Sequence, residues 1–347
     1  MAERIVLFNH KGGVSKTTTA FNLAWILSQR GKRVMVLDAD PQCNLTGLFL
    51  QDKFDSYYTD ETTRNENLMD GIRPAFDAKP EPIGSIECYQ TDSNPNLFLI
   101  PGHPNLSEFE PQLSFALTSN NAFSTLQNLP GAFHALISNT EDKYGVDYTI
   151  IDLNPGMSAI NQNLFVSSDS FIIPTNPDPF SIMALRTLSR VLPRWKVASE
   201  RIRLLLSEAT YPFPERTPLF AGHLIQRFNI RKGVAAKPFR TKMEEINEVI
   251  SSQLFPVLAK AGMTFPNEMY ESSGLLPSYC LSEVPDFQSL LQKAHKAGVP
   301  VFSLTKEQIG ETGVILENIQ RKQTEFLELF STIADKVENL TRHEVSV

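Results

Sequence analysis

Residues 8–19 read FNHKGGVSKTTT, and the chain on either side of this segment indicates how it folds. The apolar residues 5–8 lead into the segment and predict a short buried strand, while apolar residues at helical spacing follow it. A strand, a glycine turn and a helix in this order form a phosphate-binding loop, because backbone N–H groups and the helix N-terminus point at the anion. Lys16 would add a positive charge, and Thr17 could hold Mg²⁺.

The segment departs from the general phosphate-loop pattern G-x-x-x-x-G-K-[ST], because His10 and Ser15 replace its two outer glycines. A variant with a second lysine before the paired glycines fits better, and it reads KGGVSKTT over residues 11–18. This arrangement resembles the ParA/MinD family of ATPases, also called the deviant Walker A group. The resemblance implies an α/β fold of the P-loop NTPase type, with a mostly parallel twisted sheet flanked by helices on both faces.

The resemblance also implies roles for the loop residues, with ATP and Mg²⁺ as cofactors. Lys16 would neutralise the β and γ phosphates, and Lys11 would reach across a nucleotide-sandwich homodimer to the partner's phosphates. Ser15 stands where the family usually has glycine, and its effect on the hydrolysis rate stays open. The ATP-binding residues expected from the loop are Lys11, Gly12, Gly13, Val14, Ser15, Lys16, Thr17 and Thr18.

Aspartates follow two further predicted strands. Residues 34–37 predict a buried strand that leads into Asp38 and Asp40. In open α/β sheets, ligands bind outside the carboxyl ends of the strands. Taken alone, such a segment is often only a capped turn, but here it resembles the family's Asp-x-Asp-Pro-Gln segment. By that resemblance Asp40 is catalytic and orients the attacking water, while Asp38 supports the hydrated Mg²⁺.

Residues 146–151 predict another buried strand, and it ends at Asp152. This is the place of the Walker B carboxylate, which holds Mg²⁺ in P-loop enzymes. The metal-binding residues expected from the sequence are therefore Thr17, Asp38 and Asp152.

A further strand is predicted over residues 219–226. In the resembling family the residues at and just after the end of this strand contact the base, and Gln226 and Asn229 match that place. The sequence contains no Asn-Lys-x-Asp motif, which reads guanine, so adenine is favoured.

Composition and length place the chain among ordinary globular proteins, with 347 residues, 41% of them hydrophobic. We expect one domain over residues 1–347, with a variable insertion at about 48–96 and a C-terminal helix at about 311–341. Residues 298–303 predict a strand or a strand-like turn, and residues 122–138 a helix. Apolar residues at helical spacing near the end of the chain predict core packing: Ile319, Phe326, Phe330, Ile333, Val337 and Leu340.

No apolar run reaches membrane-spanning length, and the chain begins with a strand, so we expect neither a signal peptide nor a membrane span. Three widely spaced cysteines, Cys43, Cys88 and Cys280, favour reduced thiols and a cytoplasmic protein without a structural metal. The formal net charge of −7 argues against coating nucleic acid with the whole surface, but it permits a local basic patch.

Three functions within the resembling family compete. The first is a ParA-like partition ATPase that dimerises on ATP, binds nonspecific DNA, and positions or segregates DNA or another cargo with a ParB-like or other adaptor, in the bacterial cytoplasm or at the nucleoid. Two basic stretches at 186–203 and 227–242 favour it, although either alone could equally be a solvated helix face. Their cations are Arg186, Arg190, Arg194, Lys196, Arg201 and Arg203, then Arg227, Arg231, Lys232, Lys237, Arg240 and Lys242.

The second function is that of a MinD-like protein-positioning ATPase. Residues 341–347 lack the basic amphipathic character of a membrane-anchoring helix, so we expect no direct membrane anchor. The third is a metabolic or electron-transfer relative. The cysteine spacing offers no cluster site, and an amidoligase-type relative would need a second substrate pocket. We favour the ParA-like function.

Overall fold

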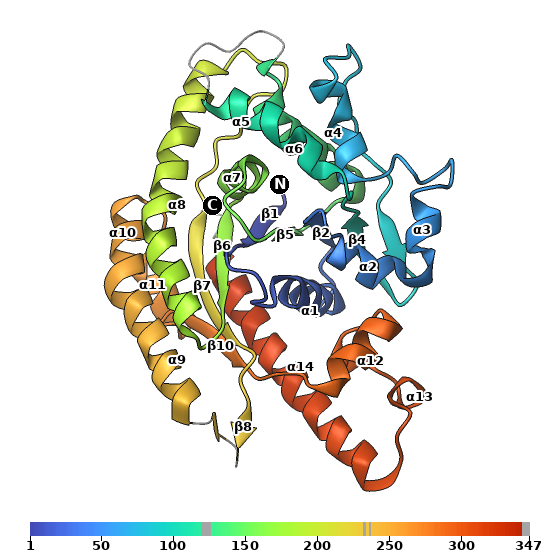
Figure 1. Cartoon of the computed structure of the whole chain (residues 1–347), viewed down its shortest axis with the longest axis vertical. Helices are drawn as coiled ribbons and strands as arrows, with labels where there is room; N and C mark the ends of the chain where they lie inside the picture. Colours follow the sequence, from blue (N-terminus) through green and yellow to red (C-terminus); the bar gives the residue numbers. More distant parts are fainter. Residues whose placement is uncertain (119–125, 232–233, 236, 342–347) are drawn as a thin grey trace, which may run out of the picture.

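The computed structural model describes residues 1–118, 126–231, 234–235 and 237–341. Its centre is a sheet with the strand order β10-β7-β6-β1-β5-β2-β4-β3 (Figure 1). Neighbouring strands are parallel except β3 and β4, which are antiparallel. The strands are β1 (Glu3–Leu7), β2 (Val34–Ala39), β3 (Tyr89–Thr91), β4 (Asn94–Ile100), β5 (Tyr148–Leu153), β6 (Ser170–Thr175), β7 (Leu219–Gln226) and β10 (Cys280–Val284), with a separate pair β8 (Ile230–Arg231) and β9 (Val234–Ala235).

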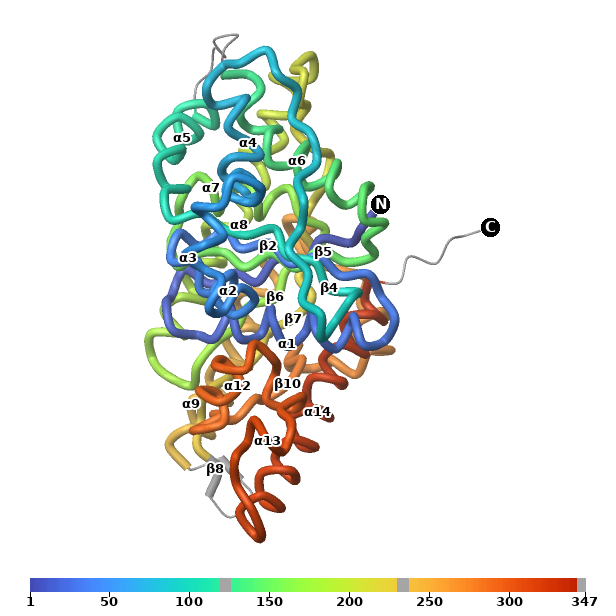
Figure 2. The backbone as a smooth tube through the Cα atoms, turned by 90° about the vertical axis from the view of Figure 1, so that its right-hand side faces the viewer, coloured from blue at the N-terminus to red at the C-terminus, as the bar shows by residue number. Residues whose placement is uncertain are grey.

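Helices cover both faces of this sheet. In Figures 1 and 2, α1 and α14 lie on one side of the strands, and α6 and α7 lie on the other. The mostly parallel α/β architecture expected from the sequence is confirmed. The helices are α1 (Lys16–Gln29), α2 (Asn44–Leu50), α3 (Phe54–Tyr57), α4 (Leu68–Phe76), α5 (Glu110–Thr118), α6 (Leu129–Tyr144), α7 (Ala159–Val166), α8 (Pro179–Leu205), α9 (Lys237–Val249), α10 (Phe255–Lys260), α11 (Asn267–Ser272), α12 (Ser289–Ala297), α13 (Lys306–Ile309) and α14 (Gly313–Thr341).

The central strands are mostly apolar because both faces of the sheet are covered. Every residue of β2, β5 and β6 is buried. Aromatic rings fill the layer between the sheet and the helices on one side, where Phe8 packs against Phe165 and Trp195 with ring centroids 5.6 and 5.3 Å apart. This packing fixes the end of β1, from which the phosphate-binding loop departs.

Helix α14 packs its apolar stripe against α1 and β10. Phe326, Phe330, Ile333, Val337 and Leu340 are buried, which confirms the predicted core packing for these positions. The stripe does not extend to the start of the helix, where Ile319 is only half-buried.

Two sequence-based assignments differ from the structure. Residues 298–303 form no strand, and Val301–Ser303 is a 3₁₀ turn after Pro300, which lacks the N–H that a ladder needs. The edge strand is instead β10, which the sequence did not indicate, because its buried residues are interrupted by Ser282 and Glu283. The helix expected over 122–138 is α6, which begins at Leu129; residues 122–125 lie outside the described part.

Among the described helices, none combines the length and apolarity needed to cross a bilayer. The three cysteines are free thiols.

A buried ion pair joins β1 to α6. The fully buried Arg4 donates from Nε and Nη2 to both carboxylate oxygens of Glu141, at 2.8 and 2.7 Å. Ser138 accepts a further bond from Nη2, and Thr149 donates to Glu141. His134 lies against the same guanidinium, and burial, together with the Arg4 charge, lowers its pKa to about 3.

We expect Glu141→Ala to lower the free energy of unfolding by about 3–5 kcal/mol, because it leaves the Arg4 charge buried without a counter-ion. Urea denaturation followed by circular dichroism measures this loss. Asp335→Ala is the control, because Asp335 pairs with Arg30 at 2.8 Å but is 63% exposed, and it should cost less than about 1 kcal/mol. Equal losses in the two variants would contradict the expectation.

Candidate functional site

The loop between β1 and α1 lies at the carboxyl end of the central strand. Strand β1 has β5 on one side and β6 on the other, so the chain connections diverge at this point. Ligands of open α/β sheets bind at such a switch point. A pocket of about 450 Å³ opens there, and its lining includes residues 12–18, Asp40, Pro155 and Arg227.

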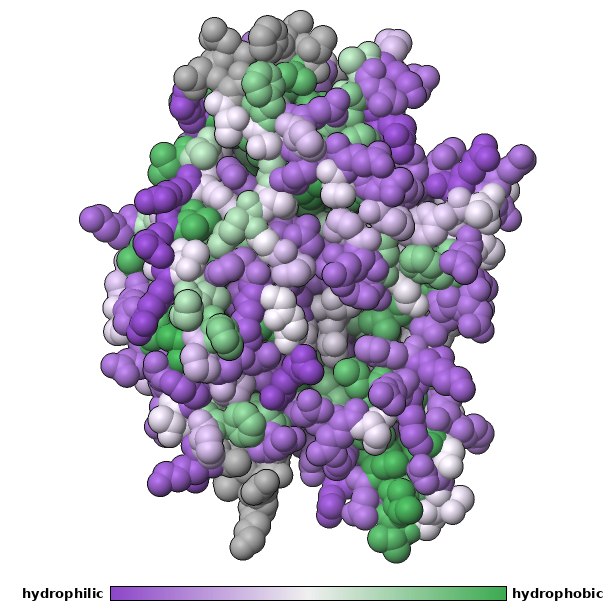
Figure 3. Space-filling view, viewed as in Figure 1, coloured by the Kyte–Doolittle hydropathy of each residue, from purple (hydrophilic) through white to green (hydrophobic). Residues whose placement is uncertain are grey.

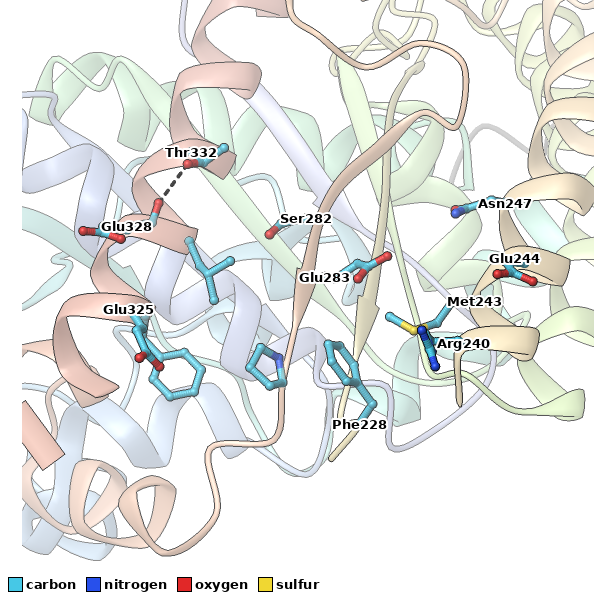
Figure 4. Close-up of a pocket in the computed structure, with 13 residues that line it drawn as sticks. Phe228, Arg240, Met243, Glu244, Asn247, Ser282, Glu283, Glu325, Glu328 and Thr332 are labelled. Atoms are coloured by element: carbon cyan, nitrogen blue, oxygen red, sulfur yellow. Dashed lines mark hydrogen bonds between the residues drawn. The ribbon is translucent and has the colours of Figure 1, made fainter. Parts of the chain in front are cut away.

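A larger groove of about 740 Å³ lies elsewhere, between α9, β10 and α14. Figure 4 shows Glu325 and Glu328 of α14 on one side of it and Arg240, Met243 and Asn247 of α9 on the other. It contains none of the residues expected at the nucleotide site. The volume of a pocket therefore does not identify the candidate site. The position of the smaller pocket, at the carboxyl ends of the parallel strands, does.

The loop contains a backbone conformation that explains the family's usual glycine. Ser15 precedes α1 with φ 58° and ψ 33°, in the left-handed region. Glycine adopts this conformation freely, whereas a residue with a Cβ is destabilised there by roughly 1 kcal/mol. The Ser15 carbonyl accepts bonds from the N–H and the hydroxyl of Thr19, both at 2.9 Å, which hold the first turn of α1 in place.

The two lysines of the loop lie in different places. Lys16 is buried and its Nζ lies 3.2 Å from the Asn9 carbonyl, inside the loop. Burial lowers the pKa of Lys16, while the charges of Asp152 and Asp40 oppose that shift. The Nζ of Lys11 instead contacts Asp178 at 2.5 Å, at the start of α8. Of the two, only Lys16 lines the pocket.

Asp38 is held by its own turn. The sheet register places it opposite Asp152 on the adjacent strand. One Asp38 oxygen accepts bonds from the N–H and the hydroxyl of Thr46, each at 2.8 Å, and the other accepts one from the Asp40 N–H at 3.1 Å. Burial raises the pKa of Asp38 to about 6. Because Asp38 accepts a hydrogen bond from the Asp40 N–H, it positions the turn that carries Asp40.

Asp152 is buried, and neither of its oxygens has a hydrogen-bond partner of good geometry in the described part of the chain. Burial first, and then the Asp38 charge, raise its pKa to about 7, while the nearby Thr17 hydroxyl and Lys16 act in the opposite direction. Buried polar groups are normally bonded, so an orphaned carboxyl group indicates a missing partner. Mg²⁺ fits, because it binds one or two carboxylates together with nucleotide phosphates.

Asp40 lines the pocket and is mostly buried. Its Oδ1 accepts a bond from the Gln42 N–H at 2.9 Å, which fixes the carboxylate next to the loop. The structure therefore brings Asp38, Asp40 and Asp152 together with Lys16 and Thr17.

The two residues expected at the base do not line the pocket. Gln226 is buried and donates from Nε2 to the Thr19 hydroxyl at 2.7 Å, between β7 and α1. Asn229 is exposed farther along. Arg227, between them, does line the pocket. The sequence contained a signal for it, namely a cation at the carboxyl end of a parallel strand. Leu291 and His295 of α12 also line the pocket, and no motif marks them.

The fold and this loop define a nucleotide-binding protein of the P-loop NTPase class. Residues 2–203 match the family model AAA_31, described as an AAA domain, which is of the ParA/MinD type. The match covers more than half of the chain, so the chain belongs to this family.

Similar proteins agree with this assignment. A replication protein A of Rhizobium rhizogenes, described as putative, is 32% identical over 181 residues, 52% of this chain and 42% of the relative. The chromosome partitioning protein ParA of Caulobacter vibrioides is 30% identical over 191 residues, 55% of this chain and 62% of the relative. The matched regions thus span about half the length of these curated relatives.

Two solved structures share the fold along nearly the whole chain. The ATP complex of a McdA variant from Cyanothece has a TM-score of 0.57 at 16% identity, covering 97% of this chain and 96% of that one. The ParA of pNOB8 bound to nonspecific DNA has a TM-score of 0.51 at 18% identity, covering 98% and 99%.

We expect Asp152→Asn to raise the thermal stability of the nucleotide-free protein at pH 8. A carboxyl group whose pKa is raised from 3.8 to about 7 on folding destabilises the folded state as pH rises from about 4 to 7. The stability gained by the variant should grow through this window and then level off, at no more than about 4 kcal/mol. Thermal melts at pH 4, 5, 6, 7 and 8 measure it.

Asp52→Asn removes an exposed carboxylate and should leave the pH profile unchanged. A constant difference between Asp152→Asn and the unmodified protein at every pH would contradict the assigned shift.

Proposed function

We propose that this protein is a ParA-like ATPase switch that hydrolyses the β–γ phosphoanhydride bond of ATP, slowly and with stimulation by an adaptor. The observation that carries the proposal is the presence of Lys16, Thr17 and Asp40 at one pocket, with an orphaned Asp152 buried close to Lys16 and Thr17. Catalysis of phosphoryl transfer is mainly positioning and charge stabilisation, and these residues supply both.

Each residue has one task in this proposal. Loop N–H groups and Lys16 bind the β and γ phosphates, and the Asp40 carboxylate accepts a hydrogen bond from the attacking water and aims it. Thr17 and Asp152 hold Mg²⁺, which when bound neutralises phosphate charge. Asp38 keeps the Asp40 turn in place. Adenine is the expected base by family resemblance, although neither Gln226 nor Asn229 lines the pocket in the single chain.

Lys11 acts in the partner subunit's site. In the single chain its ammonium group is engaged by Asp178 and by the Ser181 hydroxyl at 3.4 Å. To reach the phosphates across an ATP-bound homodimer, Lys11 leaves these partners. Hydrolysis is therefore coupled to dimerisation.

The proposal includes binding of nonspecific DNA in the ATP state, and α8 supplies the best surface for it. Arg186, Arg190 and Arg194 are exposed at one helical face, and in the described part of the chain no carboxylate lies within ion-pair distance of them. They span about 12 Å of helix axis. Figure 3 shows hydrophilic side chains interleaved with apolar ones along the left edge, over α8. Unpaired guanidinium groups in a row suit phosphate backbones.

Other members of the two basic stretches face elsewhere. Arg203 donates inward to the Pro214 carbonyl at 2.6 Å, and Lys196 pairs with Glu200. Lys242 pairs with Glu245. Lys237 and Arg240 are exposed, whereas the side chain of Arg231 and all of Lys232 lie outside the described residues.

The proposed setting is the bacterial cytoplasm or nucleoid, with an adaptor of the ParB type linking the switch to its cargo. The curated ParA relative is a chromosome partitioning protein, and a neighbour of the same fold binds nonspecific DNA. These descriptions support the proposal.

We expect Lys16→Ala to reduce ATP affinity by at least about 100-fold, because it removes a charge-assisted contact between a buried ammonium group and the phosphates. Isothermal titration with Mg²⁺-ATP measures the affinity. Lys260→Ala, at an exposed position of α10, is the matched control. An unchanged affinity in Lys16→Ala refutes the assignment of the loop.

We expect simultaneous replacement of Arg186, Arg190 and Arg194 by alanine to weaken binding of random-sequence DNA in the presence of ATP. The plot of the logarithm of the DNA association constant against the logarithm of salt concentration has a negative slope. Its magnitude should decrease by about 2–3, because each lost phosphate contact removes about 0.9. Fluorescence anisotropy between 50 and 200 mM salt measures it. A triple variant at the exposed Lys53, Lys260 and Lys296 has the same net charge and should retain the slope; equal slopes in both variants would exclude α8 as the contact.

A further inference from the structure

The end of β7 carries a backbone conformation that calls for a functional reason. Arg227 has φ 60°, in the left-handed region, although it is not glycine. Its N–H donates to the Val284 carbonyl at 3.1 Å, so the next strand holds this conformation in place. Such conformations are energetically unfavourable and gather at functional sites. The turn directs the side chain back toward the loop.

The Arg227 side chain reaches across to the phosphate loop. Its Nη1 donates to the Gly13 carbonyl at 3.0 Å. The same carbonyl accepts a second bond, also at 3.0 Å, from the Asn176 Nδ2 at the end of β6. Two donors from neighbouring strands therefore fix the Gly13 carbonyl on their own side of the loop. A phosphate-binding loop needs this, because its N–H groups must face the anion.

Most of the donor capacity of Arg227 remains available. A guanidinium group has five N–H donors in a fixed fork. One of them, on Nη1, is used in the bond to the Gly13 carbonyl. Among the described residues, no carboxylate lies within ion-pair distance of this arginine. The residue is exposed and lines the same pocket as Lys16 and Asp40. An unpaired cation beside a phosphate loop is suited to bidentate contact with phosphate oxygens.

We propose that Arg227 binds the phosphate chain of the nucleotide from within the same subunit and holds the Gly13 carbonyl out of the loop. This inference rests on the proposed nucleotide site and assigns that site a cation besides Lys16 and Lys11. Because Arg227 belongs to the same chain, the contact does not require dimerisation. The contact is to phosphate, so it strengthens binding of any purine nucleoside triphosphate alike.

The test compares Arg227→Ala, Arg227→Lys and Asn176→Ala by isothermal titration of the full chain with Mg²⁺-ATP, with GTP measured by competition. We expect Arg227→Ala to weaken ATP binding at least tenfold, with the ATP-to-GTP affinity ratio unchanged. Asn176→Ala removes only the second Gly13 contact and should lose less than threefold. Arg227→Lys keeps the charge and should recover part of the affinity. Arg321→Ala, which removes an exposed arginine of α14 outside the nucleotide pocket, is the matched control.

Two results would overturn the inference. If Asn176→Ala and Arg227→Ala weaken ATP binding equally, Arg227 acts only through Gly13. If Arg227→Ala changes the ATP-to-GTP ratio, Arg227 reads the base and not the phosphates. Lys16→Ala separates these results from failure of the proposed function: loss of ATP binding there, with unchanged binding in Arg227→Ala, refutes the Arg227 contact alone. Absence of ATP binding in the unmodified protein refutes both.

Discussion

Two carboxyl groups on adjacent strands, those of Asp38 and Asp152, are buried side by side at the centre of the sheet, and the rest of the site depends on this pairing. Burial disfavours the ionised form of both groups, and the Asp38 charge raises the pKa of Asp152 further. The chain satisfies Asp38 with three hydrogen bonds from its own turn and leaves Asp152 without any of good geometry. The nearby ammonium group of Lys16 compensates in part. A phosphate-bound cation would complete the arrangement, so a ligand that binds the folded state also stabilises it.

The same arrangement places the two lysines of the loop in different surroundings. Lys16 is inside, where the carboxylates oppose its desolvation. Lys11 lies outside the pocket, where its Nζ donates a hydrogen bond to the Asp178 carboxylate. The same carboxylate caps α8 by accepting a hydrogen bond from the Ser181 N–H at 2.8 Å. One aspartate thus connects the loop to the helix that carries the exposed arginines. Both members of the pair are partly exposed, so solvent screens it, which is consistent with the proposed movement of Lys11 to a partner subunit.

The sequence predicted what local patterns determine. The buried strands β1, β2, β5, β6 and β7 are mostly apolar. The aspartates near the carboxyl ends of β2 and β5 could be placed close to the loop because parallel strands end at one edge. The edge strand β10 escaped prediction because polar residues interrupt its buried positions. The spacing of the arginines and lysines along the sequence could not predict which of them face solvent. Arg203 and Arg227 turn inward to backbone carbonyls that only the tertiary fold supplies.

Backbone strain around the pocket follows from the same geometry. Ser15 and Cys43 precede α1 and α2 in left-handed conformations, with φ 58° and 52°, and Arg227 ends β7 with φ 60°. Each would be destabilising by roughly 1–2 kcal/mol in isolation, yet all three direct a chain segment sharply into or along the pocket wall. Glycine would remove the strain at Ser15 and Cys43, but at Arg227 it would also remove the guanidinium group. A non-glycine residue at that position therefore agrees with the proposed role of the side chain, whose observed contact is the Gly13 carbonyl.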